Sequence, residues 1–381
     1  MFDVICVGAG ALGTFHAYHA AKKRYNVAIL EKNSRPDGAT VRNFGQVVPS
    51  GMNIKWQQYG RESLAIYAEI QKLFNISIRN NGTVYIASNE DEMQLLEELS
   101  EINKANDYTS VKLSKNECLE KYSGLKQEYA VGGLFFPQEV TVEPRVMINR
   151  LHQYLTAEYN VDIHFNTTVI NCEQLSDGVE VLVAGGKKIK AKKVFICNGD
   201  EFQLLYPEQF AVSDIEITKL QMMQTKPQQG YVLPGSILTG LTIKRYESFT
   251  ECPSYKEIKA KESADALYKK WGVHILFKQA TDGSVILGDS HMYSGIKDKA
   301  KLGFDNSEEI NEYMIEEAKK IIDLPNYDIA YRWYGMYSQC KTQDIFNKDV
   351  SKDIRVITAI GGKGMTGSAG YSKEQIEEVL N

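Results

Sequence analysis

The stretch FDVICVGAGALGTFHAYHAAKKRYNVAILEK, residues 2–32, decides the fold. It starts with a short apolar run and then passes through the turn Gly8-Ala9-Gly10-Ala11-Leu12-Gly13. An alanine-rich helical stretch follows, and a second apolar run ends at Glu31. This order predicts a strand, a glycine turn, a helix and a second strand, which together form the start of a Rossmann-like α/β unit.

Each glycine of this turn meets a steric requirement of a bound dinucleotide. Gly8 permits the tight turn, Gly10 lets a pyrophosphate approach the main chain, and Gly13 lets the helix pack on the sheet. Glu31, 18 residues after Gly13, is placed to accept hydrogen bonds from a ribose diol, and its charge disfavours a 2′-phosphate. The pattern predicts FAD or NAD rather than NADP, and the alternative is a glycine-rich turn without a ligand.

The composition is that of a globular chain with a mildly acidic balance. With 381 residues, 43% of them hydrophobic and 24% charged, the chain is long enough for two structural units. A net charge of -5 without a basic block argues against nucleic acid or an anionic membrane as a partner. The six cysteines form no CxxC pair, and no stretch reaches the roughly 20 apolar residues of a membrane span. We expect a cytoplasmic protein without a metal site and without stable membrane insertion.

The order of the remaining segments predicts a discontinuous domain. The regions 161–199 and 215–295 are rich in strands, and the chain closes with a second strand, glycine loop and helix from residue 353 onwards. We therefore expect an α/β fold in which 1–79, 140–204 and 322–381 form a Rossmann-like cofactor domain. Residues 80–139 and 205–321 are expected to form an inserted α+β substrate domain on a mostly antiparallel sheet.

Five features in order carry a resemblance to a known family. They are GAGALG with Glu31, ATVRNFG at 39–45, GGLFFPQEVTVEP at 132–144, VFICNGD at 194–200 and GGKGMTGSAG at 361–370. In these features the chain resembles the FAD-dependent amine oxidoreductases related to D-amino acid oxidase, glycine oxidase and monomeric sarcosine oxidase. ATVRNFG and GDSHMY, residues 288–293, most resemble a bacterial subgroup associated with aminophosphonate breakdown. The resemblance selects FAD over NAD.

The resemblance also implies where the chain approaches FAD. The loop 38–51 is expected to run under the flavin, the main chain of Val169 to contact adenine, and Asn198 and Gly199 to pass the pyrophosphate. Arg42 is expected either to stabilise the reduced flavin or to tie the loop to a carboxylate elsewhere. The expected cofactor-binding residues are Gly8, Gly10, Ala11, Leu12, Gly13, Glu31, Lys32, Ala39, Thr40, Arg42, Asn43, Phe44, Gly45, Val169, Asn198, Gly199, Gly361, Gly362, Lys363, Gly364, Met365 and Thr366.

Departures from the family pattern are also informative. Sarcosine oxidases attach flavin through a cysteine in a Cys-Met-Tyr-Thr segment, whereas this chain has Gly335-Met336-Tyr337-Ser338, so we expect non-covalent FAD. Tyr337 stands where glycine oxidase and D-amino acid oxidase carry a carboxylate-binding arginine. The strand Val285–Gly288 lacks the oxygen-activating lysine of sarcosine oxidases. The electron acceptor is therefore oxygen or another molecule not yet identified.

Candidate substrate-site residues follow from the need to hold an anionic group. We expect catalytic roles for Arg42, His291 and Arg332, and substrate contacts from Arg245, Tyr246 and Tyr337. A structural ion pair is the alternative for Arg332, a satisfied interior histidine for His291, and a surface position for Tyr246.

The predicted function is oxidation of the C–N bond of a small anionic, secondary amine, such as an aminophosphonate or amino acid. Hydride transfer to flavin N5 gives an imine that hydrolyses to a carbonyl compound and an amine. One alternative is an FAD-dependent 2-hydroxy-acid dehydrogenase with His291 as the base. Another is a non-catalytic nucleotide-binding module.

Overall fold

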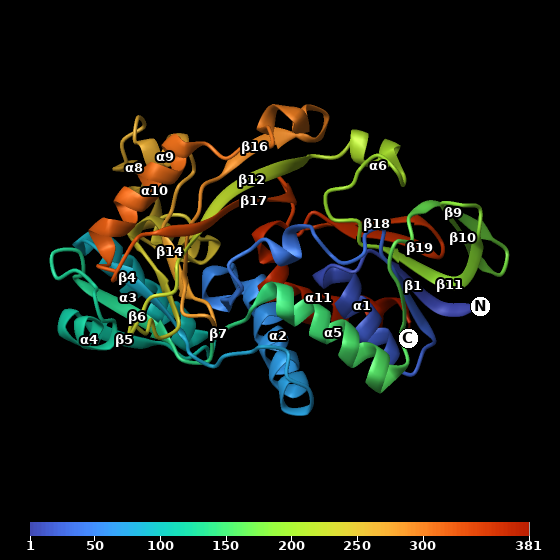
Figure 1. The fold of residues 1–381 in the computed structure, drawn as a ribbon, viewed down its shortest axis with the longest axis horizontal. Coiled ribbons are helices and arrows are strands. Elements are labelled where there is room, and N and C mark those ends of the chain that lie inside the picture. The colour runs from blue at the N-terminus through green and yellow to red at the C-terminus, as the bar shows by residue number, and fades with distance from the viewer. Residues whose placement is uncertain (381) are drawn as a thin grey trace.

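The computed structural model describes residues 1–380 and contains two large sheets (Figure 1). The first sheet has a parallel centre, with one antiparallel strand at its edge and a hairpin attached to β11. In spatial order its strands are β18 (Phe346–Ser351), β19 (Ile354–Thr358), β11 (Lys188–Ile196), β1 (Phe2–Val7), β2 (Val27–Leu30) and β8 (Asp162–His164), with the hairpin β9 (Val169–Leu175) and β10 (Gly178–Val183). Strands from both ends of the chain therefore meet in one sheet, as expected for a discontinuous domain.

The second sheet is antiparallel except where β13 and β4 pair in parallel. In spatial order its strands are β16 (Met292–Gly295), β12 (Ile215–Thr225), β15 (Val285–Gly288), β14 (Leu276–Gln279), β13 (Ser236–Leu238), β4 (Thr83–Ala87), β6 (Gly132–Phe136) and β5 (Val111–Ser114), and β17 (Ile329–Cys340) also pairs with β12. The predicted α/β fold class, with a mostly antiparallel substrate sheet, is confirmed. However, β17 belongs to the second sheet although it lies within the segment 322–381 expected in the cofactor domain.

The helices pack around these sheets. Four long helices pack together beside the first sheet: α1 (Ala11–Lys22), α2 (Ile54–Leu73), α5 (Pro144–Tyr159) and α11 (Gly364–Val379). The others are α3 (Glu90–Ala105), α4 (Lys115–Lys121), α6 (Pro207–Ala211), α7 (Gly240–Ile243), α8 (Tyr255–Ala260), α9 (Leu267–Lys270) and α10 (Glu308–Ile321). The short strands β3 (Gln46–Val47) and β7 (Val140–Thr141) form a separate pair. Within residues 1–380, no helix combines the length and apolar character that a membrane crossing requires.

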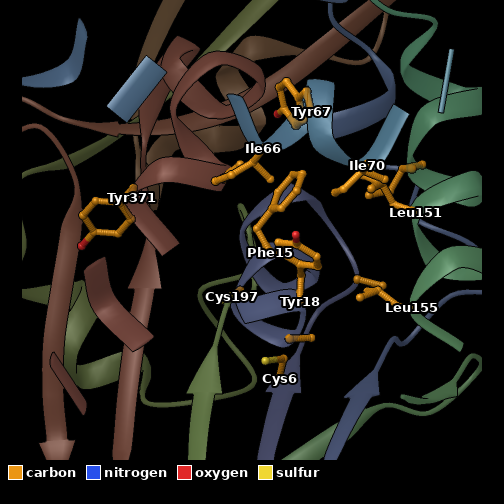
Figure 2. Close-up of a cluster of buried hydrophobic side chains, with 14 of the residues drawn as sticks. Cys6, Phe15, Tyr18, Ile66, Tyr67, Ile70, Leu151, Leu155, Cys197 and Tyr371 are labelled. Carbon is orange, nitrogen blue, oxygen red and sulfur yellow. The ribbon is translucent and has the colours of Figure 1, made fainter. Parts of the chain in front are cut away.

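A core of aromatic and aliphatic side chains fixes α1 in place (Figure 2). Phe15 of α1 lies 5.5 Å from Tyr67 of α2, measured between ring centroids. Leu151 and Leu155 of α5 complete this cluster, and both are fully buried. Each such side chain contributes roughly 1.5–3 kcal/mol by burial. Because α1 packs against α2, α5 and α11, the position of its N-terminus, where the glycine turn lies, is also fixed.

Steric limits require two glycines in that turn. Gly8 has a φ of +103°, and a Cβ there would lie 2.4 Å from the carbonyl oxygen of Cys197. A Cβ on Gly13 would lie 2.0 Å from the carbonyl oxygen of Gly8. Both distances are impossible for a real side chain, so the strand, turn and helix can pack this closely only with glycine at both positions.

Candidate active site

A cavity of about 490 Å³ is lined by segments of both sheets. On the side of the first sheet, its walls come from the glycine turn, the end of β2, the loop 36–52, the start of β9 and the segment 197–201. Residues of β12, β14 and β17 line it from the second sheet, and residues 358–368 close it. A ligand bound at the glycine turn can therefore extend to the second sheet without leaving the cavity.

The carboxylate of Glu31 closes the glycine turn onto the end of β2. Its Oε2 accepts the main-chain N–H of Ala9 at 2.9 Å, and its Oε1 accepts that of Asn33 at 3.0 Å. Glu31 is buried and lines the cavity. A carboxylate fixed in this way keeps free lone pairs with which to accept the hydroxyls of a ribose.

The N-terminus of α1 offers an anion site beside this carboxylate. The first turn of the helix contains no acidic residue, and Gly10, Ala11 and Leu12 all line the cavity. Gly10 carries no side chain that could cover the main chain, and a Cβ there would meet only the hydroxyl of Thr40, at 3.2 Å. Of the main-chain donors here, the N–H of Ala11 already donates to Oγ1 of Thr40 at 3.0 Å. The residues present nevertheless fit the pyrophosphate of FAD, which a helix N-terminus favours.

All but two of the expected cofactor-binding residues line this cavity. The exceptions are Gly13 and Arg42. Gly13 packs under the carbonyl of Gly8, which is the helix-packing role expected from the sequence.

The guanidinium of Arg42 does not line the cavity. Its Nε donates to the carbonyl oxygen of Asp37 at 2.6 Å, and Nη1 donates to that of Tyr334 at 3.4 Å. It also lies over the ring of Tyr334, 5.9 Å from the centroid. Arg42 thus ties the loop 36–52 to β17, through main-chain carbonyls rather than the carboxylate expected, and its guanidinium is not placed to stabilise a flavin in the cavity.

Arg332 also lies outside the cavity. Its Nε is 3.6 Å from Oε2 of Glu308 on α10, and its side chain is 36% exposed. This contact corresponds to the structural ion pair expected as the alternative, and it directs Arg332 away from the cavity. The sequence alone does not define this direction of the side chain on β17.

Arg245 is the cavity cation available to an anion. Three basic side chains line the cavity, and two have acidic partners: Lys363 lies 2.7 Å from Glu247, and Lys32 lies 3.6 Å from Glu201. Throughout residues 1–380, no carboxylate lies within ion-pair distance of Arg245, whose Nη2 donates to the hydroxyl of Tyr293 at 2.6 Å. Burial acts to lower the pKa of Arg245, but Tyr293 and other neighbours outweigh it and raise this pKa.

Tyr246, Tyr337 and His291 line the same cavity. Burial raises the pKa of both tyrosines, so their hydroxyls stay protonated and can donate hydrogen bonds. Nδ1 of His291 lies 3.1 Å from the carbonyl oxygen of Gly272. Because a carbonyl can only accept, Nδ1 carries the proton, and Nε2 of a neutral His291 is an acceptor.

Two further residues of this site, His274 and Asp289, were not predicted as site residues. The main-chain N–H of His274 donates to the carbonyl of Asp289 at 3.0 Å, which brings the two side chains together. Nε2 of His274 lies 2.8 Å from Oδ1 of Asp289, while Nδ1 of His291 lies 3.8 Å from the same oxygen. Asp289 stands within the quoted GDSHMY stretch, two residues before His291, and this spacing is the only sequence signal for it.

The charge state of this group follows from burial. Burial lowers the pKa of His291 to about 3, although Asp289 opposes the change, and burial also lowers the pKa of His274. Burial acts to raise the pKa of Asp289, but His291, His274 and Arg245 outweigh it and lower this pKa. At neutral pH, Asp289 is therefore an anion between two neutral imidazoles.

The same three side chains could also hold a divalent metal ion, because their ligand atoms lie within 4.8 Å of one another. Nε2 of His274 lies 2.8 Å from Oδ1 of Asp289, so these two side chains already contact each other without a metal ion.

A dinucleotide site that continues into a cavity lined by a second sheet is the arrangement expected of an FAD-dependent oxidoreductase. In agreement, residues 3–375 match the DAO family, described as FAD dependent oxidoreductase, and the chain belongs to this family. It is therefore an enzyme that uses FAD, which confirms the predicted cofactor and removes the non-catalytic module from consideration.

The relatives include enzymes named for amines and for an alcohol. The chain is 27% identical over 146 residues to mitochondrial sarcosine dehydrogenase of Mus musculus, a match that covers 37% of this chain and only 16% of that enzyme. It is 22% identical over 395 residues to glycerol 3-phosphate dehydrogenase of Caloramator mitchellensis, covering 100% of this chain and 74% of that enzyme. The crystal structure of glycine oxidase from Geobacillus kaustophilus has the same fold, with a TM-score of 0.76, 16% identity and coverage of 100% of this chain and 94% of that chain.

Proposed function

We propose that the protein oxidises the C–N bond of a small, secondary amine that carries an anionic group, such as an aminophosphonate or an amino acid. The observation that supports this most is the state of Arg245, a partly buried cavity cation without an acidic partner in residues 1–380. A buried charge is costly unless it is paired, so a ligand with an anionic group is the natural counter-ion.

The side chains around Arg245 can orient such a substrate. Arg245 would hold the phosphonate or carboxylate, and the hydroxyls of Tyr246 and Tyr337 would add neutral hydrogen bonds. Tyr337 stands where related enzymes carry an arginine, so Arg245 takes over anion binding from a different segment of the chain. When bound, FAD supplies N5 as the acceptor of a hydride from the carbon next to nitrogen. The imine product then hydrolyses to a carbonyl compound and an amine.

A 2-hydroxy acid is the second candidate substrate. It is supported by Nε2 of His291, which is an acceptor in the cavity and could take a hydroxyl proton. The likeness to a glycerol 3-phosphate dehydrogenase supports it as well, although the identity is only 22%. The low pKa of His291, about 3, makes it a weak base, which favours the amine.

Anaerobic reduction of the bound flavin tests the proposal. Purified holoenzyme is mixed without oxygen with N-methyl-2-aminoethylphosphonate, sarcosine, glycine, D-amino acids and a set of 2-hydroxy acids. Bleaching of the flavin band by an amine, with release of methylamine or ammonia, supports the proposal. Bleaching by a hydroxy acid alone supports the second candidate. Admission of air after bleaching then shows whether oxygen is the electron acceptor.

A further inference from the structure

Asp289 is a buried carboxylate that lines the cavity and keeps an oxygen free. Its exposed fraction is 6%, and among residues 1–380 its Oδ1 has no hydrogen-bond donor. The 2.8 Å contact with Nε2 of His274 satisfies an ion-pair distance but not the direction of a hydrogen bond. Oδ1 therefore retains a lone pair that a ligand could use.

Neutral histidines do not balance the charge of Asp289. Thr242 Oγ1 lies 3.1 Å from Nδ1 of His274, and the Gly272 carbonyl accepts from Nδ1 of His291. Burial lowers the pKa of both rings, so each is a neutral imidazole. The groups around Asp289 include the phenols Tyr246 and Tyr337, which burial keeps protonated. The one full positive charge among these neighbours is that of Arg245.

Arg245 and Asp289 nevertheless do not form an ion pair. Across residues 1–380, no carboxylate oxygen lies within 4.0 Å of the Arg245 guanidinium, although Asp289 is among the groups that influence its pKa. Opposite charges buried in the same cavity normally pair, because a buried charge without a partner is destabilising. One cation and one anion held apart in a cavity are complementary to a ligand that carries both charges.

We propose that Asp289 is an anionic subsite that binds the positively charged nitrogen of the substrate, so that the cavity takes up its substrate as a zwitterion. Before the neighbouring carbon gives up its hydride, the bound nitrogen releases this proton to water, because hydride transfer requires the nitrogen lone pair. This inference deepens the proposed function and rests on it, because it assigns Arg245 to the anionic end of the substrate and Asp289 to the nitrogen. It also separates the two candidate substrates, because a hydroxy acid carries no cation and would leave the charge of Asp289 without a partner.

The test compares two ligands of the same shape that differ by one charge. Betaine, trimethylammonioacetate, has a fixed positive charge and no nitrogen lone pair to oxidise, and 3,3-dimethylbutanoate replaces its nitrogen with carbon. A second pair, (2-trimethylammonioethyl)phosphonate and (3,3-dimethylbutyl)phosphonate, covers a phosphonate substrate. Binding to the holoenzyme is measured by the perturbation of the flavin absorption spectrum and by calorimetry.

We expect the wild type to bind the charged member of one pair at least about tenfold more tightly than its uncharged isostere. In Asp289→Asn this preference should fall to about twofold or less, while the uncharged isostere keeps its affinity within about twofold. Asp289→Glu, which retains the charge, should keep part of the preference. Glu312→Gln, which removes an exposed acid on α10, should leave it unchanged.

Three outcomes would overturn the inference. The first is that the wild type does not prefer the charged ligand in either pair, which includes the case that none of the four ligands binds. The second is that Asp289→Asn still prefers the charged ligand. The third is that Asp289→Asn retains its flavin spectrum but loses affinity equally for the charged ligand and its uncharged isostere. If Asp289→Asn does not fold, the preference for the charged ligand in the wild type and in Asp289→Glu still tests the inference. Because binding is measured without turnover, a positive result would stand even if no amine reduced the flavin, in which case only the proposed reaction would fail.

Discussion

Oε2 of Glu31 accepts the main-chain N–H of Ala9 at 2.9 Å, so the acid that ends β2 also braces the glycine turn that follows β1. Oε1 braces the next loop by accepting the N–H of Asn33 at 3.0 Å. One carboxylate thus shapes the nucleotide site and remains open to a ribose. Because Glu31 has both roles, even an isosteric substitution at this position should affect FAD binding.

Replacement of Glu31 by glutamine should weaken FAD binding. Glutamine leaves one acceptor oxygen and adds an NH₂ group that faces a main-chain donor, a loss of about 1–3 kcal/mol. The Kd for FAD should therefore rise by about tenfold to a hundredfold. Titration of apoprotein into FAD, followed by quenching of flavin fluorescence, measures it. Glu128→Gln, at an exposed acid, is the control, and equal FAD affinity in both variants would contradict the expectation.

Alanine at Gly13 should disrupt the turn, whereas alanine at Gly295, which is exposed and outside the cavity, should be tolerated. A Cβ at Gly13 would lie 2.0 Å from the Gly8 carbonyl oxygen, while nothing lies within 4 Å of a Cβ at Gly295. Overpacking of this kind costs about 1–3 kcal/mol, so Gly13→Ala should lower the urea midpoint and the retained FAD. The flavin-to-protein absorbance ratio and urea unfolding report both effects. Equal FAD content in the two variants would count against this packing role.

Lysine at Arg245 should weaken substrate binding without changing the cofactor. Lysine keeps the charge but loses the planar fork that binds a phosphonate or carboxylate through two bonds. We expect KM to rise by about tenfold or more and the flavin spectrum to remain that of the wild type. Arg332→Lys makes the same chemical change outside the cavity and should alter KM by less than about twofold. Steady-state kinetics with the best amine substrate would measure both KM values. A larger rise in KM for Arg332→Lys than for Arg245→Lys would identify Arg332 as the residue that binds the anionic group.

Glu139 should make the protein less stable as the pH rises. It is fully buried, and burial raises its pKa from 4.5 to about 7, although hydrogen bonds from the Ser50 N–H and the Tyr108 hydroxyl oppose the change. Below pH 4.5 both the folded and unfolded states hold the proton. Between pH 4.5 and 7 only the unfolded state loses this proton. Glu139 therefore lowers the free energy of unfolding by up to about 3 kcal/mol, and this decrease is complete above pH 7.

Glu139→Gln should remove this pH-dependent loss because glutamine stays neutral. Relative to the wild type, the variant should be more stable at pH 8 by up to about 3 kcal/mol and close to it at pH 4.5. Urea unfolding of the holoenzyme at both pH values measures the difference. Glu97→Gln, at an exposed acid on α3, should show no such change with pH. A stability difference for Glu139→Gln that is the same at both pH values would argue against a titrating Glu139.

The sequence by itself determined the nucleotide-binding half of the protein. The glycine turn and Glu31 act through local sterics and through two neighbouring strands, so their spacing in the chain is enough to predict the Rossmann-like start and its cofactor class. The strand and helix order also predicted a discontinuous cofactor domain, because a strand, glycine loop and helix recur at the C-terminus.

Only the tertiary structure decided which side chains line the part of the cavity proposed to bind the substrate. His274 precedes β14 and Asp289 follows β15, and the antiparallel register that pairs Leu276 with Gly288 brings the two side chains together. Arg245 reaches them from the end of α7, while the side chains of Arg42 and Arg332 turn to partners outside the cavity. Strand pairing between distant segments sets which side chains share a cavity, and the spacing of residues along the chain carries no record of it.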